Sequence, residues 1–263
     1  MEDNKRKVFD NNTPPFEKLI AIMAVLRSKE GCTWDRKQTH KSLLPYLIEE
    51  TYEVVEAIET GNHEHLCEEL GDLICQIVFH AQLAKEKRLF DIDEAVDSIN
   101  NKLIKRHPHV FGEKKDLTPK QVRNQWEKIK IDSGEKKTVF SGLPKSMPAL
   151  IMAYRIGEKA SGIGFDWKEA EDVLDKISEE FDEIKTEYFS ENKDKLKEEI
   201  GDLLFAVTSF ARKMEINPEL ALKEALNKFN ERFTKMEEIV YNSGKKFEDY
   251  SLEQLEEIWQ QVK

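Results

Sequence analysis

Hydrophobic positions recur every three or four residues along most of this chain, and no stretch of any length shows the two-residue alternation of a β-strand. Residues 43–60 and 63–87 both follow the helical spacing, with Gly61-Asn62 between them as a helix stop. A second pair of helices is expected at residues 168–190 and 194–214. The pattern therefore predicts an all-α protein built from helical bundles.

Acidic side chains cluster on the polar edges of the first helix pair. Glu49, Glu50 and Glu53 share one edge of the first helix, and Glu69 and Asp72 share one edge of the second. If the two helices form an antiparallel hairpin, these carboxylates converge, and neither motif contains a Lys or Arg to neutralise them. A single copy of this pattern is nevertheless more often a solvated acidic face than a metal site.

The same acids occur a second time. Glu179, Glu180, Glu183, Glu199 and Asp202 repeat them with a constant displacement of 130 residues (179 minus 49, and 202 minus 72) and with no gap between the motifs. Most surface positions of the two copies differ, so a solvated face gives no reason for five acids to stay in register. The repeat therefore predicts two metal-binding helical units.

The ligand types limit the choice of metal. Clusters of carboxylates alone suit Mg²⁺, with Mn²⁺ as a substitute, rather than zinc or copper. The Glu-x-x-His motif of di-iron bundles is missing from both copies, because Asp72 and Asp202 stand where the histidine would be. His107 and His109 flank a proline at the end of an expected helix, and we interpret them as loop residues rather than ligands.

Charge, glycine and proline mix in residues 131–147, which we interpret as a linker. The expected domains are residues 13–130 and residues 148–263, and the polar residues 1–12 are expected to lack stable structure. A loop is expected at residues 31–35, where Gly31 breaks the helical spacing.

Composition excludes several classes of protein. The net charge of -11 disfavours a nucleic acid polymer as partner. The cysteines are three in number and form no Cys-x-x-Cys pair, which indicates reduced thiols. No signal peptide or long apolar run is present, so we expect no membrane association and a cytoplasmic protein. A Gly-x-x-x-x-Gly-Lys phosphate loop is also missing.

Magnesium held by several carboxylates most often serves phosphate chemistry. Together with Cys32-Thr33-Trp34-Asp35, Lys105-Arg106-His107-Pro108-His109-Val110-Phe111 and Gly164-Phe165-Asp166-Trp167, the duplicated acids resemble the MazG family of nucleoside triphosphate pyrophosphohydrolases. The resemblance runs from about Pro15 to Val262. It implies two tandem MazG-like bundles, a homodimer, Mg²⁺ dependence, and hydrolysis of ribo- and deoxynucleoside triphosphates to the monophosphate and pyrophosphate with broad base tolerance.

The family's functional residues carry over by position. The resemblance implies Glu180, Glu183, Glu199 and Asp202 as metal ligands of the second domain, and Glu179 as the catalytic, water-orienting base. In the first domain the equivalents are Glu50, Glu53, Glu69 and Asp72, with Glu49 as a further candidate. The implied substrate-binding residues are Lys195, Lys228 and Arg232 for the triphosphate and Trp259 near the nucleotide. From the residues alone, Trp259 would be a core residue.

The displacement of 130 also predicts that the second domain carries the main catalytic site. Lys228 corresponds to Ser98 and Lys195 to His65, so the first domain has fewer cations for an anionic substrate. Two alternatives stay open: a pyrophosphohydrolase dedicated to one modified or deoxyuridine nucleotide, and a non-catalytic helical interaction protein that binds metal structurally. Pyrophosphate release measured across a panel of nucleotides distinguishes these two alternatives from an enzyme with broad base tolerance.

Overall fold

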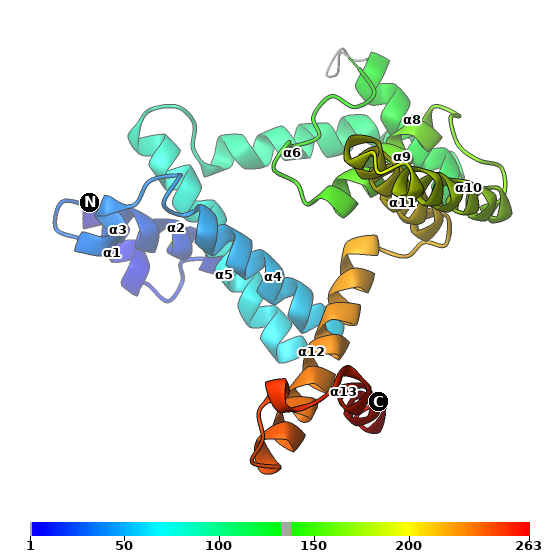
Figure 1. Cartoon of the computed structure of the whole chain (residues 1–263). Helices are drawn as coiled ribbons and strands as arrows, with labels where there is room; N and C mark the ends of the chain where they lie inside the picture. Colours follow the sequence, from blue (N-terminus) through cyan, green and yellow to red (C-terminus); the bar gives the residue numbers. More distant parts are fainter. Residues whose placement is uncertain (1, 133–137) are drawn as a thin grey trace. The chain divides into compact units, whose positions relative to one another are not determined.

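The computed structural model describes residues 2–132 and 138–263, and every regular element in these ranges is helical (Figure 1). Contacts divide the chain into two compact units, Met1–Lys114 and Lys115–Lys263. The helices of the first unit are α1 (Glu2–Phe9), α2 (Pro15–Leu26), α3 (Thr33–Lys37), α4 (Leu44–Thr60), α5 (His63–Glu86), α6 (Ile92–Arg106) and α7 (Pro108–Phe111). Those of the second are α8 (Pro119–Asp132), α9 (Ala149–Gly162), α10 (Ala170–Phe189), α11 (Lys193–Lys213), α12 (Pro218–Asn242), the 3₁₀ turn η1 (Phe247–Asp249) and α13 (Leu252–Gln261). The predicted all-α fold is confirmed.

Three expectations from the sequence differ from the structure. The segment expected to lack structure contains α1, which packs against α2, and the loop expected at residues 31–35 contains the start of α3. Residues 119–130 were expected in the first domain, whereas α8 contacts α9 of the second unit. Part of the predicted linker, residues 133–137, lies outside the described residues. All three cysteines are free, as expected.

The first unit is organised around the antiparallel hairpin of α4 and α5 (Figure 1). Gly61 ends α4 with a φ of 67°, a left-handed conformation that glycine adopts without steric cost. Asn62 then caps α5, because its side chain accepts a hydrogen bond from the His65 backbone N–H at 3.1 Å. The apolar faces of α2 and α5 form the core through Met23, Val78, Phe79 and Leu83, together with Leu43.

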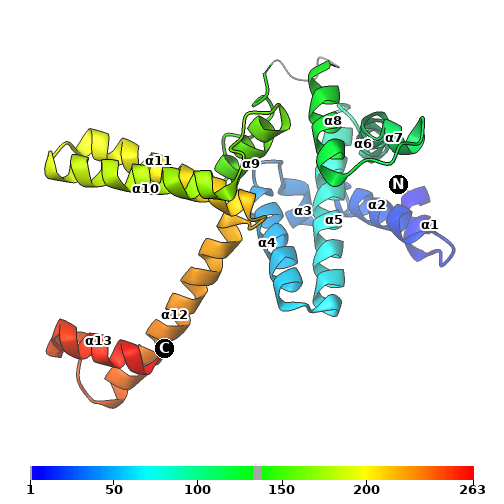
Figure 2. The same ribbon diagram turned by 90° about the vertical axis from the view of Figure 1, so that its right-hand side faces the viewer.

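The second unit repeats this hairpin with α10 and α11, which Figure 2 shows side by side. Glu191 stands at the position of Gly61 and keeps the left-handed conformation, with a φ of 58°. Because Glu carries a Cβ, this conformation costs about 1 kcal/mol. Asn192 caps α11 by accepting from the Lys195 backbone N–H at 3.2 Å. The same turn geometry therefore recurs with a different residue at its most demanding position.

A half-buried ion-pair network ties the segment before α10 to the end of α11. Arg212 donates to Asp166 through two nitrogens, at 2.5 and 3.2 Å, and Lys213 lies 3.2 Å from the same carboxylate. Burial alone would raise the pKa of Asp166, but these hydrogen bonds lower it overall. Asp166 therefore stays ionised and positions the Gly164–Trp167 loop against α11.

Helices α12 and α13 form a separate apolar cluster within the second unit. Met236, Val240 and Ile258 are its buried members, and Phe233 and Trp259 pack on them. Elsewhere, large hydrophobic side chains remain exposed on the hairpins, including Ile48, Ile77, Phe181 and Leu204. None of the described helices has the length and apolar character needed to cross a membrane.

Candidate functional site

The first acidic centre forms where the two helices of the α4–α5 hairpin face each other. Glu50 on α4 and Glu69 and Asp72 on α5 each offer one carboxylate oxygen, and these oxygens lie within 4.8 Å of one another. Glu50 and Asp72 are equally far from Gly61 along the chain, so the antiparallel pairing brings them opposite each other. The hairpin thus converts a sequence pattern into a three-carboxylate group.

Two acids of the first centre have raised pKa values. Desolvation raises the pKa of Glu69, and the nearby Glu53 carboxylate raises it further. Desolvation also raises the pKa of Glu50, partly offset by a hydrogen bond from the Gln76 amide at 3.4 Å. His65 Nε2 lies 2.8 Å from Glu69. Protein groups therefore only partly compensate these charges, which leaves the centre suited to a cation.

The second acidic centre repeats the arrangement on α10 and α11. Glu180, Glu199 and Asp202 place their carboxylate oxygens within 4.8 Å of one another, and Glu180 is 5% exposed. Partial desolvation raises the pKa of Glu183, with contributions from Glu199 and Glu180. Each centre thus contains three of its four predicted ligands in one group, with Glu53 or Glu183 close enough to interact electrostatically.

A lysine distinguishes the second centre from the first. Lys176 Nζ lies 2.8 Å from Glu179 and 2.7 Å from Glu180, which follow it by three and four residues on the same helix. These hydrogen bonds raise the pKa of Lys176. At the corresponding position the first unit has Tyr46, so no lysine at that position compensates its acids. Lys176 was not among the residues predicted from the sequence, although its spacing of three and four residues from Glu179 and Glu180 indicates an ion pair on one helix face.

The other predicted residues are less closely associated with the two centres. Glu179 lies outside the three-carboxylate group, with its side chain 58% exposed and paired with Lys176. Lys195 lies 3.7 Å from Glu187. Trp259 packs on Phe229, with ring centroids 5.1 Å apart. The role of Glu49 as a ligand, the roles of Lys228 and Arg232 on α12, and that of Trp259 all stay predictions.

The donor set fits a hard divalent ion. Every member of both centres is a carboxylate oxygen, and neither His107 nor His109 belongs to a potential metal-binding group among the described residues. Oxygen ligands of this kind match Mg²⁺ and Mn²⁺. Two acidic centres on equivalent hairpins can therefore each hold a metal ion.

Comparison with known proteins gives a consistent result over nearly the whole chain. The family description "MazG nucleotide pyrophosphohydrolase domain" matches residues 38–111 and 168–237, which contain the two hairpins. The Thermotoga maritima protein named nucleoside triphosphate pyrophosphohydrolase/pyrophosphatase MazG is 49% identical over 94% of this chain and 95% of its own length. The Escherichia coli K12 nucleoside triphosphate pyrophosphohydrolase is 42% identical over 94% of this chain and 97% of its own length.

Removal of the lysine beside the second centre should strengthen metal binding. We expect Lys176→Met to raise the affinity for Mn²⁺ by about tenfold, because a bound ion would no longer compete with an ammonium group for Glu180. Isothermal titration of the metal-free protein, without nucleotide, measures this affinity. Lys185→Met is the matched control, since Lys185 pairs with Asp182 at 2.8 Å with the same three-residue spacing but outside the centre. Unchanged or weaker Mn²⁺ binding by Lys176→Met would contradict the prediction.

Proposed function

The chain belongs to the MazG family of nucleotide pyrophosphohydrolases, and from this premise we propose that it hydrolyses the nucleoside triphosphates of several bases with Mg²⁺ as the cofactor. The observation that carries the proposal is the repeated group of carboxylates at equivalent positions of two hairpins. The products would be the nucleoside monophosphate and pyrophosphate. As a nucleoside triphosphate pyrophosphohydrolase, the protein is an enzyme rather than a non-catalytic interaction module.

In the second centre, Glu180, Glu183, Glu199 and Asp202 would hold the metal. When bound, a divalent ion supplies charge neutralisation for the phosphates and lowers the pKa of a bound water. Glu179 would orient the attacking water as a base, for which it has to leave its ion pair with Lys176. Lys176, once free of the carboxylates, lies close enough to the centre to approach the substrate phosphates.

The main catalytic site is proposed to lie in the second unit. Both units keep their carboxylates, so the proposed difference in catalytic activity arises from their positively charged side chains. Lys176, Lys195 and Lys228 correspond to Tyr46, His65 and Ser98, whereas Arg232 corresponds to Lys102 and keeps its charge. Each charge-assisted contact to phosphate contributes about 1.5 to 3 kcal/mol. The first unit therefore holds a triphosphate more weakly.

The protein is proposed to act as a homodimer. Phe181 and Leu204 on the α10–α11 hairpin are 51% and 53% exposed, and Ile48 and Ile77 leave a similar apolar surface on the α4–α5 hairpin. If a hairpin of one copy packs against the same hairpin of a second copy, the two form a four-helix bundle, which is the usual way to cover such faces. We expect light scattering at micromolar concentration to give twice the mass of the chain. A fully active monomer would contradict the proposal.

A panel of nucleotides tests the reaction and its base tolerance together. We expect pyrophosphate release from most ribo- and deoxynucleoside triphosphates in Mg²⁺ or Mn²⁺, and loss of release in excess chelator, because the acids cannot hold a triphosphate without cations between them. Phosphate- and pyrophosphate-specific assays run in parallel establish which bond is cut. Turnover confined to one modified or deoxyuridine nucleotide would support the dedicated enzyme instead, and hydrolysis that persists in chelator would exclude the metal.

Matched substitutions compare the two centres. We expect Glu180→Gln to lower kcat/KM by about a hundredfold, because it removes a ligand charge with little change in side-chain shape. We expect Glu50→Gln, at the equivalent position of the first unit, to leave most of the turnover. Asp182→Asn serves as a control, because Asp182 is an exposed acid of α10 outside the centre. Circular dichroism confirms folding, and a larger loss in Glu50→Gln than in Glu180→Gln would reverse the assignment.

A further inference from the structure

Two histidines of the first unit meet outside both acidic centres. His40 lies in the turn between α3 and α4, and His80 lies on α5. Their Nδ1 atoms are 2.8 Å apart, and their ring centroids are 5.1 Å apart with an angle of 13° between the ring planes. Both residues are half-buried. Neither has a role in the site described above.

The two rings meet edge to edge rather than face to face. The centroid and nitrogen separations differ by 2.3 Å (5.1 minus 2.8), which is about twice the distance from the centre of an imidazole ring to one of its atoms. Both Nδ1 atoms therefore lie on the line between the ring centres. The N–H or lone pair of each nitrogen lies in its ring plane and points at the other nitrogen, which is the geometry of a linear hydrogen bond.

This contact holds one proton between the rings. A neutral imidazole carries hydrogen on one nitrogen and a lone pair on the other, so one ring donates from Nδ1 and the other accepts at Nδ1. A metal ion does not fit on the same line, because two bonds of about 2 Å would need nitrogens about 4 Å apart. The pair is therefore built for a proton.

The pair cannot keep this geometry when both rings are charged. A charged imidazole has an N–H on each nitrogen, so two charged rings would direct N–H groups at each other across 2.8 Å. The Nε2 of His80 is also buried and has no hydrogen-bond partner among the described residues. Desolvation lowers the pKa of His80, and the charge of His40 lowers it further. Protonation of both rings therefore has to separate them.

Other charged groups do not account for the lowered pKa of His80. Among the described residues, His40 is the ionisable group that contributes to it. Three charged groups from the elements packed against α5 have partners of their own: Arg27 of α2 with Glu86, Glu50 of α4 with Gln76, and Asp91 before α6 with Lys85. The protonation of His80 thus depends on its contact with His40 and on burial.

The turn that carries His40 sets the start of α4. Within the turn, the Thr39 backbone N–H donates to the Ser42 hydroxyl at 2.8 Å, and the Ser42 N–H donates to the Thr39 hydroxyl at 3.1 Å. Leu43 follows, is 1% exposed and belongs to the same core cluster as Val78 of α5. His40 therefore adds a polar contact with α5 beside the apolar contact of Leu43.

The second unit has no counterpart of this pair. The displacement of 130 residues relates His40 to Ala170 and His80 to Phe210, and neither side chain can bind a proton. Ala170 is already the first residue of α10, whereas α4 begins only after the His40 turn, at Leu44. A response of this pair to pH is therefore confined to the first unit.

We propose that His40 and His80 form a proton-sensitive switch that fastens the start of α4 to α5 and releases it when both imidazoles are charged. The folded pKa of His80 lies below the usual value of 6.5, so the unfolded chain binds its proton more readily. The stability that the contact contributes is thus present above this value and is lost as the pH falls through the lower, folded pKa. The switch needs neither metal nor substrate, so it is independent of the proposed function.

Hydrogen exchange of backbone amides tests the release. The Leu43 and Leu47 N–H groups donate to the Thr39 and Leu43 carbonyls and report on the turn and on the first turn of α4. We expect their protection, relative to an unfolded chain at the same pH, to fall about tenfold between about pH 7.5 and about pH 5. His40→Gln and His80→Gln, which leave no pair of facing cations, should abolish most of this fall.

The control separates the pair from other groups that titrate nearby. His63→Gln removes an exposed imidazole at the start of α5 and should keep the full fall in protection. A fall that persists in the folded His40→Gln and His80→Gln proteins would assign it to the carboxylates of the hairpin and overturn the switch. Constant protection in the wild type would overturn it too.

The tautomers give a second test that needs no variant. We expect the imidazole ¹⁵N resonances of the wild type at about pH 8 to show one of the two rings with its hydrogen on Nδ1, since the linear contact requires a donor there. Hydrogen on Nε2 in both rings would leave two lone pairs facing each other and would exclude the hydrogen bond on which the proposal depends.

Discussion

Mutual repulsion among carboxylates is the constraint on which both halves of this molecule depend. Each hairpin brings three acids within 4.8 Å of one another, and one acid of each group is almost fully buried. Like charges at such separations are unfavourable unless a cation or a hydrogen-bond donor lies between them. The carboxylates that can bind a cation therefore destabilise the hairpins. Packing of the apolar helix faces has to offset this loss of stability.

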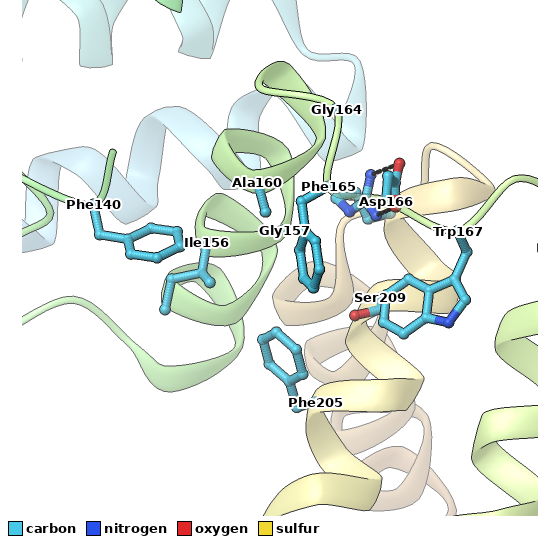
Figure 3. Close-up of a pocket in the computed structure, with 11 residues that line it drawn as sticks. Phe140, Ile156, Gly157, Ala160, Gly164, Phe165, Asp166, Trp167, Phe205 and Ser209 are labelled. Atoms are coloured by element: carbon cyan, nitrogen blue, oxygen red, sulfur yellow. Dashed lines mark hydrogen bonds and ion pairs between the residues drawn. The ribbon is translucent and has the colours of Figure 1, made fainter. Parts of the chain in front are cut away.

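The two units compensate the repulsion differently. In the second, Lys176 places an ammonium group against Glu180, so the metal-free centre already contains a positive charge. In the first, the neutral amide of Gln76 and the imidazole of His65 contact the acids instead. The same backbone thus supports two electrostatic environments. The equivalent residues Ser209 and Phe79 add to the divergence, because Ser209 lines an aromatic pocket between α9, the loop before α10 and α11 (Figure 3), whereas Phe79 completes the core of the first unit.

The acids could be identified from the sequence because their signal is local and repeated. Helical periodicity places them on one edge, a short turn makes the hairpin antiparallel, and the constant displacement identifies both centres. The helical class follows from the same periodicity. The aromatic pocket could not be predicted, because it depends on how α9 and the Gly164–Trp167 loop pack against α11, which no spacing encodes. The ordering of α1 likewise comes from its packing against α2 rather than from its own composition.

The hairpin turns impose a limit on how this chain can change in length. One residue inserted or deleted between Gly61 and His63 would rotate every later side chain of α5 by about 100° and move Asp72 away from Glu50. Glu191 adopts a left-handed backbone at the equivalent position of the second hairpin. The turn therefore accepts a residue that is unfavourable in this conformation, provided that the number of residues in the loop is unchanged. Substitutions can accumulate freely over both surfaces, but insertions are confined to segments outside the two hairpins.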